Sequence, residues 1–360
     1  MISYGIIGAG MMGQEHIRNI RLLDGARVDA IMEPDAGMRA RALALAPEAA
    51  TVETIPEMLA RRGIDCLVIA SPNHLHLSQM EEIADLRPLP LLVEKPLHTA
   101  AGEAPRLARL ERDYPAPIWV AMEYRYMPPI AMFLDRAAAE TGGIKMLTLR
   151  EHRFPFLDKV GGWNRFNATS GGTLVEKCCH FFDLMRVATG AEPVRVMASG
   201  GQAVNFLDER HDDRVPDVWD SAYTIVDFDN GARAMLELCM YAEGARYQEH
   251  LSAMGPRGKI EALVPGPTRF WGADLGPAPV PRLVLSPRRP AGERVLEVPV
   301  DPHLLEAGDH NGSTFYQHEK FLEVVRGRGS VEVTLTDGVR AVAMGLAAQA
   351  SAESGEAVRL

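Results

Sequence analysis

A glycine-rich loop near the N-terminus most constrains what this chain can fold into. It lies between an apolar strand-like run, 2–7, and a predicted helix over 13–23, and consists of Gly8-Ala9-Gly10-Met11-Met12-Gly13. The first glycine permits a tight turn, the second lets backbone approach a pyrophosphate, and the third lets the helix pack closely on the strand. Free N–H groups and the dipole at the helix N-terminus favour an anion. The loop, including Met11 and Met12, therefore predicts a dinucleotide-binding site on a parallel α/β sheet.

An acidic residue predicts which dinucleotide binds. Glu33 ends the second predicted strand, 28–32, and stands 20 residues after Gly13. A carboxylate at this place accepts hydrogen bonds from ribose hydroxyls and repels a 2′-phosphate. Pro34 follows it, where an NADP site more often offers Arg or Ser. We therefore expect NAD as the cofactor.

Strand-like and helical runs alternate through the first third of the chain. Further strands are predicted at 66–70, 91–93 and 118–122, and helices at 35–46, 55–62, 74–86 and 100–113. This alternation is typical of βαβ units and of a doubly wound parallel sheet, with ligands bound at the carboxyl ends of the strands. The turn after the third predicted strand, 66–70, is accordingly expected to contact the cofactor through Ser71, Pro72, Asn73 and His76.

The pattern changes after residue 122. Helices are predicted at 127–140 and 172–189, and strands at 145–154, 194–203, 221–228, 232–241, 248–253 and 259–264. Asp229-Asn230-Gly231 is a strong hairpin signal, and consecutive strands joined by short turns indicate an antiparallel sheet. A Pro- and Gly-rich stretch, 265–302, is expected to be loop with short edge strands, before helices at 315–326 and 336–351.

Composition excludes several classes of protein. The chain has 360 residues, enough for two domains, and a formal net charge of −10 without the basic stripe of a nucleic-acid binder. No apolar run approaches the roughly 20 residues of a membrane span. Because the N-terminus begins directly with a strand, and Cys66 and Cys239 of the four cysteines lie in apolar runs, we expect a cytoplasmic, reduced protein with no membrane or nucleic-acid partner.

Two further motifs carry a family resemblance. Glu94-Lys95-Pro96 follows the fourth predicted strand of the parallel series, and residues 170–183 have the sequence SGGTLVEKCCHFFD. With the glycine loop and the 71–74 turn, they resemble the glucose–fructose oxidoreductase/inositol dehydrogenase/rhizopine catabolism (Gfo/Idh/MocA) family over the whole chain. The resemblance implies an NAD-binding Rossmann domain at 1–122 and, at 123–360, a substrate-binding and oligomerisation domain.

The resemblance also implies details of this second domain. It predicts a large, open, mostly antiparallel sheet that pairs subunits into homodimers or homotetramers, and a last helix packed near the domain junction. It adds Glu94 and Lys95 to the cofactor site and implies that Lys95 and His180 meet at the nicotinamide.

Hydride transfer from a secondary alcohol needs a base and a group that stabilises the developing alkoxide. His180 suits the first role and Lys95 the second. Thr173, Glu176, His180 and Asp183 fall on one stripe of a helix, so Glu176 is expected to reach the substrate and Asp183 to orient the imidazole. The expected substrate is a sugar, inositol or related polyol. Glu176 replaces the usual Asp and Cys178 a usual Gly, which leaves substrate identity open.

Other substrate contacts are expected from residues near the predicted domain junction and from loops beside the 172–189 helix: Tyr124, Arg153, Trp163 and His310. Trp163 could stack on a sugar ring. No metal site is expected, because Cys178, Cys179 and His180 point about 100° apart on a helix and converge poorly on one ion.

Two alternative functions remain open from the sequence. One is redox-assisted glycoside cleavage or epimerisation, in which NAD is recycled within each turnover. The other is a non-catalytic NAD-binding sensor, against which the presence of Lys95 and His180 argues. The oxidised carbon, the physiological direction and the release of NADH also remain open.

Overall fold

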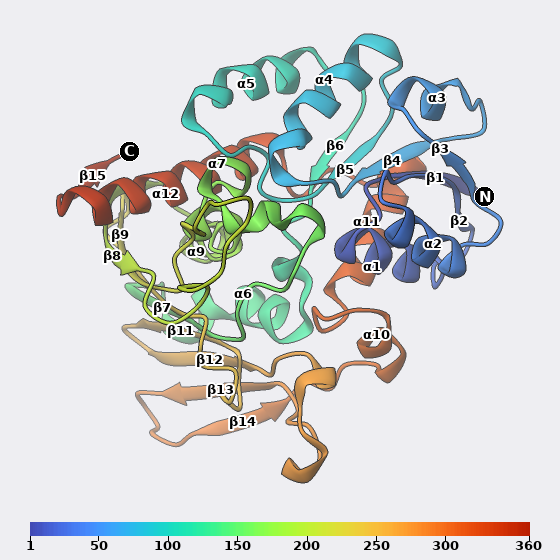
Figure 1. Ribbon diagram of the computed structural model, residues 1–360. Helices are drawn as coiled ribbons and strands as arrows, with labels where there is room; N and C mark the ends of the chain where they lie inside the picture. The colour runs from blue at the N-terminus through green and yellow to red at the C-terminus, as the bar shows by residue number, and fades with distance from the viewer. The chain divides into compact units, whose positions relative to one another are not determined.

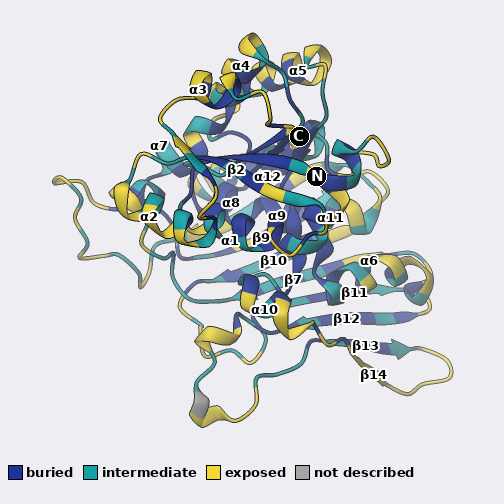
Figure 2. Ribbon diagram, turned by 90° about the vertical axis from the view of Figure 1, so that its right-hand side faces the viewer, coloured by how far each residue is buried: buried dark blue, intermediate teal, exposed yellow. Residues whose placement is uncertain are grey.

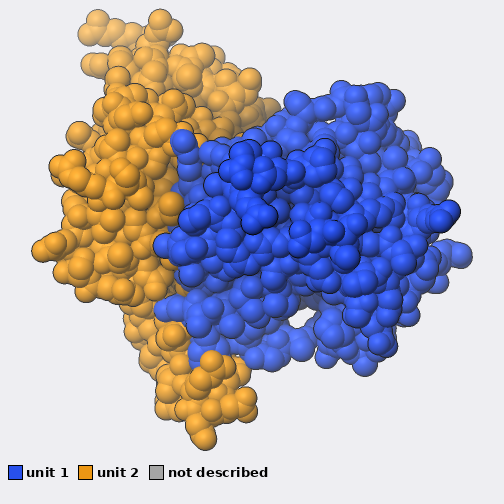
Figure 3. Space-filling view, turned by 90° about the horizontal axis from the view of Figure 1, so that it is seen from above, with its two compact units in different colours: residues 1–122, 158–171, 314–342 blue, residues 123–157, 172–313, 343–360 orange. Residues whose placement is uncertain are grey.

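The computed structural model describes residues 1–272 and 274–360, which form two units, each with its own sheet. The first unit comprises residues 1–122, 158–171 and 314–342, and the second comprises 123–157, 172–313 and 343–360 (Figure 3). Two continuous domains, 1–122 and 123–360, are expected from the sequence, whereas the structure places 158–171 and 314–342 in the first unit. The last long helix, α12 (Leu335–Ser354), accordingly has residues in both units.

The first unit contains a six-stranded parallel sheet of order β3-β2-β1-β4-β5-β6. Its strands are β1 (Ile2–Ile7), β2 (Ala26–Met32), β3 (Ala50–Val52), β4 (Cys66–Ile69), β5 (Leu91–Val93) and β6 (Ile118–Val120). The central strands β4 and β5 are buried at every residue, as their near-continuous apolar sequence requires in a sheet covered on both faces. Figure 2 shows exposed residues on the covering helices labelled α3, α4 and α5.

Helices pack on this sheet in two groups. The group of α1 (Met11–Ile20) and α2 (Ala36–Leu45) packs together, and so does the group of α3 (Ile55–Ala60), α4 (His76–Leu86) and α5 (Ala104–Asp113) (Figure 1). The strand order reverses between β1 and β4. In sheets of this kind the crevice at the reversal is where ligands bind, and the loops that follow β1 and β4 are those singled out in the sequence.

The second unit contains a nine-stranded, mostly antiparallel sheet of order β14-β13-β12-β11-β7-β10-β9-β8-β15, in which β7 and β10 pair in parallel. Its strands are β7 (Met146–His152), β8 (Pro193–Gly201), β9 (Ser221–Phe228), β10 (Arg233–Cys239), β11 (Glu249–Gly255), β12 (Gly258–Val264), β13 (Arg282–Pro287), β14 (Arg294–Glu297) and β15 (Val358–Arg359). The predicted fold class, a Rossmann domain followed by a large open sheet, is confirmed.

Alternating burial shows that this sheet has two unlike faces. In β9, buried residues alternate with the exposed Tyr223 and Ile225, and β10 repeats the alternation. Helix α6 (Pro128–Thr141) packs against β11, β12 and β13. The predicted hairpin joins β9 and β10, where Gly231 has a φ of 79° and donates its N–H to the Phe228 carbonyl.

The predicted helix over 172–189 is broken in the structure. It consists of α8 (Thr173–Glu176) and α9 (Cys179–Thr189), with Lys177 and Cys178 between them. The two pieces are buried along their length up to Met185, so packing overrides the continuous helical periodicity. The single-stripe argument for Glu176 and His180 therefore does not hold as stated, since they belong to different helices.

Several short elements differ from the predictions. Three elements are not predicted from the sequence, because they are short and weakly periodic: β3, β15 and α10 (Pro302–Ala307). The predicted helices near the C-terminus are present as α11 (Ser313–Val325) and α12. Among the residues that the structure describes, no helix combines the length and apolar character that crossing a membrane requires.

Candidate functional site

The glycine loop of the first unit has the geometry that its sequence predicts. Gly8 has a φ of 84°, and a Cβ placed there would lie 2.5 Å from the Ser71 nitrogen. A Cβ on Gly13 would lie 2.2 Å from the Gly8 carbonyl oxygen. A Cβ on Gly10, by contrast, would meet nothing within 4 Å. The outer glycines thus close the βα turn, and the space at Gly10 fits the approach of a pyrophosphate to the backbone.

Glu33 holds the glycine loop in place. Its carboxylate accepts the Ala9 N–H at 2.6 Å through one oxygen and the Asp35 N–H at 2.9 Å through the other. Two carboxylate oxygens offer about four acceptor positions, so these bonds leave capacity for ribose hydroxyls. Gly10 caps the N-terminus of α1 without a side-chain hydrogen bond, as an anion site at a helix N-terminus requires.

The loop after β4 is braced from within the first unit. His76 is fully buried, with Nδ1 2.8 Å from the Pro96 carbonyl oxygen and Nε2 2.9 Å from that of Ser71. Burial lowers the pKa of this imidazole, against the opposing effect of the two carbonyls. His76 therefore ties the Ser71 loop to the Lys95–Pro96 loop, which leaves it no ring nitrogen for the predicted contact with the cofactor. Asn73 donates to the Ser170 carbonyl at 3.0 Å.

A buried chain of polar groups lies behind Lys95. Glu94 Oε1 is 2.9 Å from His16 Nε2, and His16 Nδ1 is 2.8 Å from His318 Nε2. The other Glu94 oxygen accepts the Lys95 N–H at 3.2 Å. Burial raises the pKa of Glu94, but the bond to His16 and the nearby Lys95 outweigh it and hold the pKa below its usual range. Glu94 thus fixes the Lys95 backbone from inside the unit, and Lys95 itself is half-buried.

In the second unit, His180 lies in a tight cluster of ionisable side chains. Its ring stacks on Tyr124 with centroids 4.1 Å apart and planes 7° apart. Its Nε2 is 3.7 Å from Glu123 Oε1, and the same oxygen is 3.9 Å from His310 Nε2. Glu123 and Tyr124 belong to the 3-10 helix η3 (Glu123–Tyr126) that follows β6. The structure therefore brings together three predicted residues, Tyr124, His180 and His310.

A second group of buried charges adjoins Tyr124. Lys177 Nζ donates to the Tyr124 hydroxyl and is 2.9 Å from Glu151 Oε1. Glu151 on β7 and Glu249 on β11 are directly opposite each other in the antiparallel register. Burial, followed by the charge of Glu151, raises the pKa of Glu249 to about 7. Burial also holds the pKa of Tyr124 well above its usual value, so this hydroxyl stays protonated.

Four further residues are predicted from the sequence to contact the substrate, and each has its own set of contacts: Asp183, Glu176, Arg153 and Trp163. Asp183 forms a two-point ion pair with Arg125, at 2.6 Å to Nε, so the carboxylate seen beside His180 is that of Glu123. Glu176 is 4% exposed at the end of α8. Arg153 donates to the Phe154 carbonyl and lies 4.3 Å above that ring. Trp163 belongs to the first unit, where Lys159 Nζ lies 4.4 Å from its ring centroid.

Sequence reasoning missed Glu123, Glu151, Lys177 and Glu249. Two of them carried a signal, because Glu151 continues the inward-facing positions of Leu147 and Leu149, and Glu249 those of Leu251 and Ala253. An acid at a core-facing position of a strand needs a partner and therefore predicts a polar cluster.

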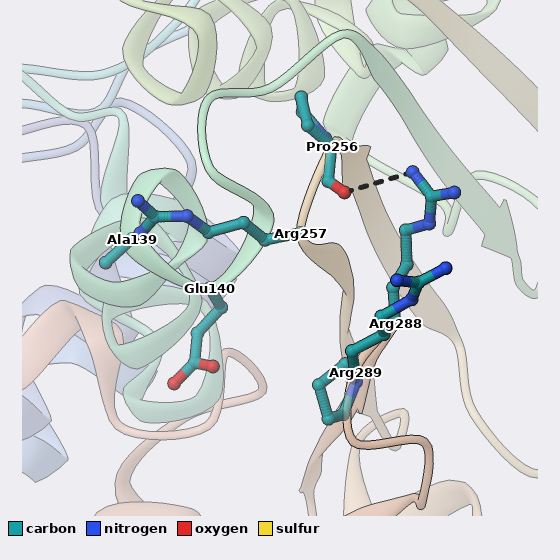
Figure 4. A pocket seen from close by; sticks show the side chains of 7 residues that line it. Ala139, Glu140, Pro256, Arg257, Arg288 and Arg289 are labelled. Carbon is teal, nitrogen blue, oxygen red and sulfur yellow. Dashed lines mark hydrogen bonds between the residues drawn. The ribbon is translucent and has the colours of Figure 1, made fainter.

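The structure also shows a pocket in the second unit, beside the residues that follow β11 and β13. It has a volume of about 580 Å³ and is lined by Ala139, Glu140, Pro256, Arg257, Pro287, Arg288 and Arg289. Arg288 donates to the Pro256 carbonyl at 3.2 Å (Figure 4). Arg257 lies two residues beyond the last residue of β11, whereas Glu249 is the first residue of that strand, so this pocket is separate from the His180 cluster. Within the described parts of the chain, no three His, Cys, Asp or Glu side chains converge to hold a metal ion.

Comparisons with known proteins match both halves of the chain. Residues 2–122 match the model of the oxidoreductase family, NAD-binding Rossmann fold, of the Gfo/Idh/MocA proteins. Residues 139–360 match the model of the oxidoreductase family, C-terminal alpha/beta domain, of the same proteins. The predicted NAD cofactor is thereby supported by the family of the first unit.

Curated relatives are matched over part of their length. The chain is 31% identical to the rhizopine catabolism protein MocA of Rhizobium meliloti over 52% of this chain and 57% of that protein. It is 29% identical to the inositol 2-dehydrogenase of Leifsonia xyli subsp. xyli over 65% of each. The chain thus spans between about half and two thirds of the length of these relatives.

Solved structures share the fold over the full chain. A putative myo-inositol dehydrogenase from Sinorhizobium meliloti 1021 has a TM-score of 0.77 at 19% identity, covering 100% of this chain and 99% of that one. GenD2 from gentamicin A biosynthesis, in complex with NAD, has a TM-score of 0.78 at 20% identity, covering 100% and 96%. With its glycine loop, its two sheets and both domain models matched, this chain belongs to the Gfo/Idh/MocA oxidoreductase family.

Proposed function

We propose that this protein is an NAD-dependent dehydrogenase that oxidises a secondary hydroxyl of a sugar, inositol or related polyol. The observation that carries the proposal is the surroundings of His180, an imidazole stacked on Tyr124 at 4.1 Å and 3.7 Å from the buried carboxylate of Glu123. An imidazole held in one orientation beside a carboxylate is the arrangement of a general base. The naming of a relative as an inositol 2-dehydrogenase supports the substrate class.

The proposal assigns roles to side chains of both units. In the first unit, the Gly8–Gly13 loop and Glu33 would hold NAD, which when bound accepts a hydride from the alcohol carbon. Lys95, whose backbone is fixed by Glu94, would stabilise the developing alkoxide with its ammonium group. In the second unit, His180 would accept the hydroxyl proton, and Glu176 would hold a substrate hydroxyl.

A substrate screen with matched variants tests this function. Purified protein is offered inositols, aldoses, sugar acids and glycosides with NAD or NADP, and NADH or NADPH formation is followed. Lys95→Ala and His180→Ala should each lower turnover by about 100-fold or more, while NAD binding by Lys95→Ala persists. Lys145→Ala, which removes an exposed lysine of the second unit, is the control. Near-normal turnover by Lys95→Ala, or no oxidation of any polyol, would contradict the proposal.

The same screen separates the dehydrogenase from an enzyme that recycles NAD. A dehydrogenase releases one NADH for each product molecule, whereas glycoside cleavage or epimerisation through a transient ketone releases none. Product formation without net NADH would therefore assign the recycling reaction to the same residues. An absence of any turnover, with NAD bound, would favour a sensor.

We further propose that the second unit joins subunits into homodimers or homotetramers. Large apolar side chains are exposed on its strands, including Tyr223 at 58% and Ile225 at 42% on alternate positions of β9. Alternate positions of one strand share one face of the sheet, so these residues form an apolar surface. Light scattering on the intact protein tests this, and Tyr223→Lys with Ile225→Lys should shift the mass toward that of a monomer.

A further inference from the structure

We infer that Glu123 and His310 form a path that carries a proton from His180 toward solvent. This inference rests on the proposed function, because a proton is released at His180 only when a hydroxyl is oxidised there. It adds Glu123 and His310 to the residues that handle the proton. Glu123 belongs to none of the sequence motifs, and His310 takes a role other than the predicted substrate contact.

The geometry of the path is set by one carboxylate oxygen. Glu123 Oε1 is 3.7 Å from His180 Nε2 and 3.9 Å from His310 Nε2. The His180 side chain is 2% exposed and that of Glu123 1%, whereas that of His310 is 21% exposed. Exposure therefore increases only at His310, which gives the path an inner and an outer end.

Surrounding structure holds the three groups in this order. Tyr124 stacks on His180 at 4.1 Å and its ring centroid is 6.0 Å from that of His310, so one aromatic ring borders both imidazoles. His310 lies in the segment after α10, next to Asn311, which has a φ of 52° and donates to the Pro265 carbonyl at 3.2 Å. Both distances to Glu123 exceed those of hydrogen bonds, as is common in catalytic sites that tighten when substrate binds.

The proton transfers balance along this path. Oxidation would break the substrate O–H bond, and its proton would form an N–H bond on one ring nitrogen of His180; NAD, when bound, would accept the hydride. His180 passes the proton on its Nε2 to Glu123 Oε1, and Glu123 passes it to His310 Nε2. His310 then releases the proton on its other nitrogen to water. One proton is released for each hydride transferred, and all three side chains return to their starting charges.

Other charged groups of the second unit have partners of their own. Lys177 contacts the Tyr124 hydroxyl and Glu151, and Asp183 is paired with Arg125. Glu176 ends α8 on the other side of the helix break from His180. One Glu123 oxygen lies within 4 Å of both imidazoles. Its removal should therefore affect His180 and His310 together.

The first experiment needs no activity. Histidine side-chain signals are followed by NMR in a pH titration of the intact protein and of Glu123→Gln. Loss of the shared carboxylate should move the titration midpoints of both His180 and His310 to lower pH, because a negative charge that stabilises each imidazolium is removed. Glu306→Gln, on the exposed face of α10, is the control. An unchanged midpoint at either histidine overturns the path.

The second experiment follows the rate of NADH formation in two His310 variants and one control variant. His310→Ala and His310→Gln should both lose about 100-fold in turnover, the lower end of what a positioned proton-transfer group contributes. Added imidazole should restore much of this loss, because a small base replaces the missing step. His303→Ala, an exposed histidine of α10, should show neither effect.

The outcomes separate the path from other roles of His310. Normal turnover by His310→Gln would show that an amide suffices, and would overturn proton transfer. A loss that imidazole does not restore, in a variant with an unchanged melting temperature, would show that His310 acts by packing. This result would also overturn proton transfer. If the intact protein oxidises no polyol, the proposed function fails, while the NMR titration still decides whether Glu123 couples the two histidines.

Discussion

Tyr124 stacks face to face on His180, with ring centroids 4.1 Å and planes 7° apart, and its hydroxyl accepts a hydrogen bond from Lys177. One residue thus joins the proposed base to the group of buried charges formed by Lys177, Glu151 and Glu249. Because the ring and the hydroxyl make different contacts, substitutions at Tyr124 can separate them.

Tyr124→Phe should keep the stack and lose the hydroxyl. The buried Lys177 ammonium then lacks one acceptor, at a cost of about 1–3 kcal/mol in the free energy of unfolding. Tyr124→Ala also removes the ring and should cost about 4 kcal/mol. Urea denaturation measures both values. Equal stability of the two variants would show that the stack contributes nothing.

The free energy of unfolding should depend on pH through Glu249. Burial and Glu151 raise its pKa to about 7 in the folded state, above the unfolded value. The folded state therefore binds the proton more tightly, so the stabilisation is complete below the unfolded pKa and is lost as the pH rises through about 7. The loss should be on the order of 3 kcal/mol.

Glu249→Gln should remove most of this pH dependence between about pH 4.5 and pH 7. Denaturation at several pH values measures the slope, with Glu243→Gln, an exposed acid, as the control. A Glu249→Gln variant with the parental slope would assign the titration to another group.

Lys177→Met should destabilise the second unit. It removes the cation 2.9 Å from Glu151 and leaves Glu151 opposite Glu249 in the core without that partner. Breaking a buried ion pair from one side costs about 3–5 kcal/mol. Adding Glu151→Gln to Lys177→Met should recover part of the loss. Thermal melting of the parent, the two single variants and the double variant gives a double-mutant cycle that measures it. Additive losses would show that the two side chains do not interact.

The glycine loop should respond differently at its second and third glycines. Gly13→Ala places a methyl group 2.2 Å from the Gly8 carbonyl oxygen and should destabilise the first unit by about 3 kcal/mol. Gly10→Ala meets no protein atom within 4 Å, so the fold should be unaffected while NAD affinity falls. Melting temperatures and calorimetric titration with NAD test both. Unchanged NAD affinity in Gly10→Ala would mean that the cofactor does not approach this backbone.

Local sequence determined much of the first unit. The strand, the Gly8–Gly13 loop and the following helix are neighbours in the chain, so their chemistry is visible in one short segment. Glu33 was predictable for the same reason, since its distance along the chain from Gly13 follows from one helix and one strand. Its bond to the Ala9 N–H at 2.6 Å, however, appears only in the structure.

Tertiary structure decided how the second unit is organised around His180. The motif over 170–183 identifies the imidazole, but only the structure shows Glu123 3.7 Å from it and Arg125 paired with Asp183. The Glu151–Glu249 pair exists only because β7 and β11 meet in one particular register. Such contacts join residues many positions apart. A single sequence does not specify the register between two distant strands, or the residue at which a packed helix breaks. The chain alone therefore determined the cofactor and the candidate base, and packing decided which charges surround that base.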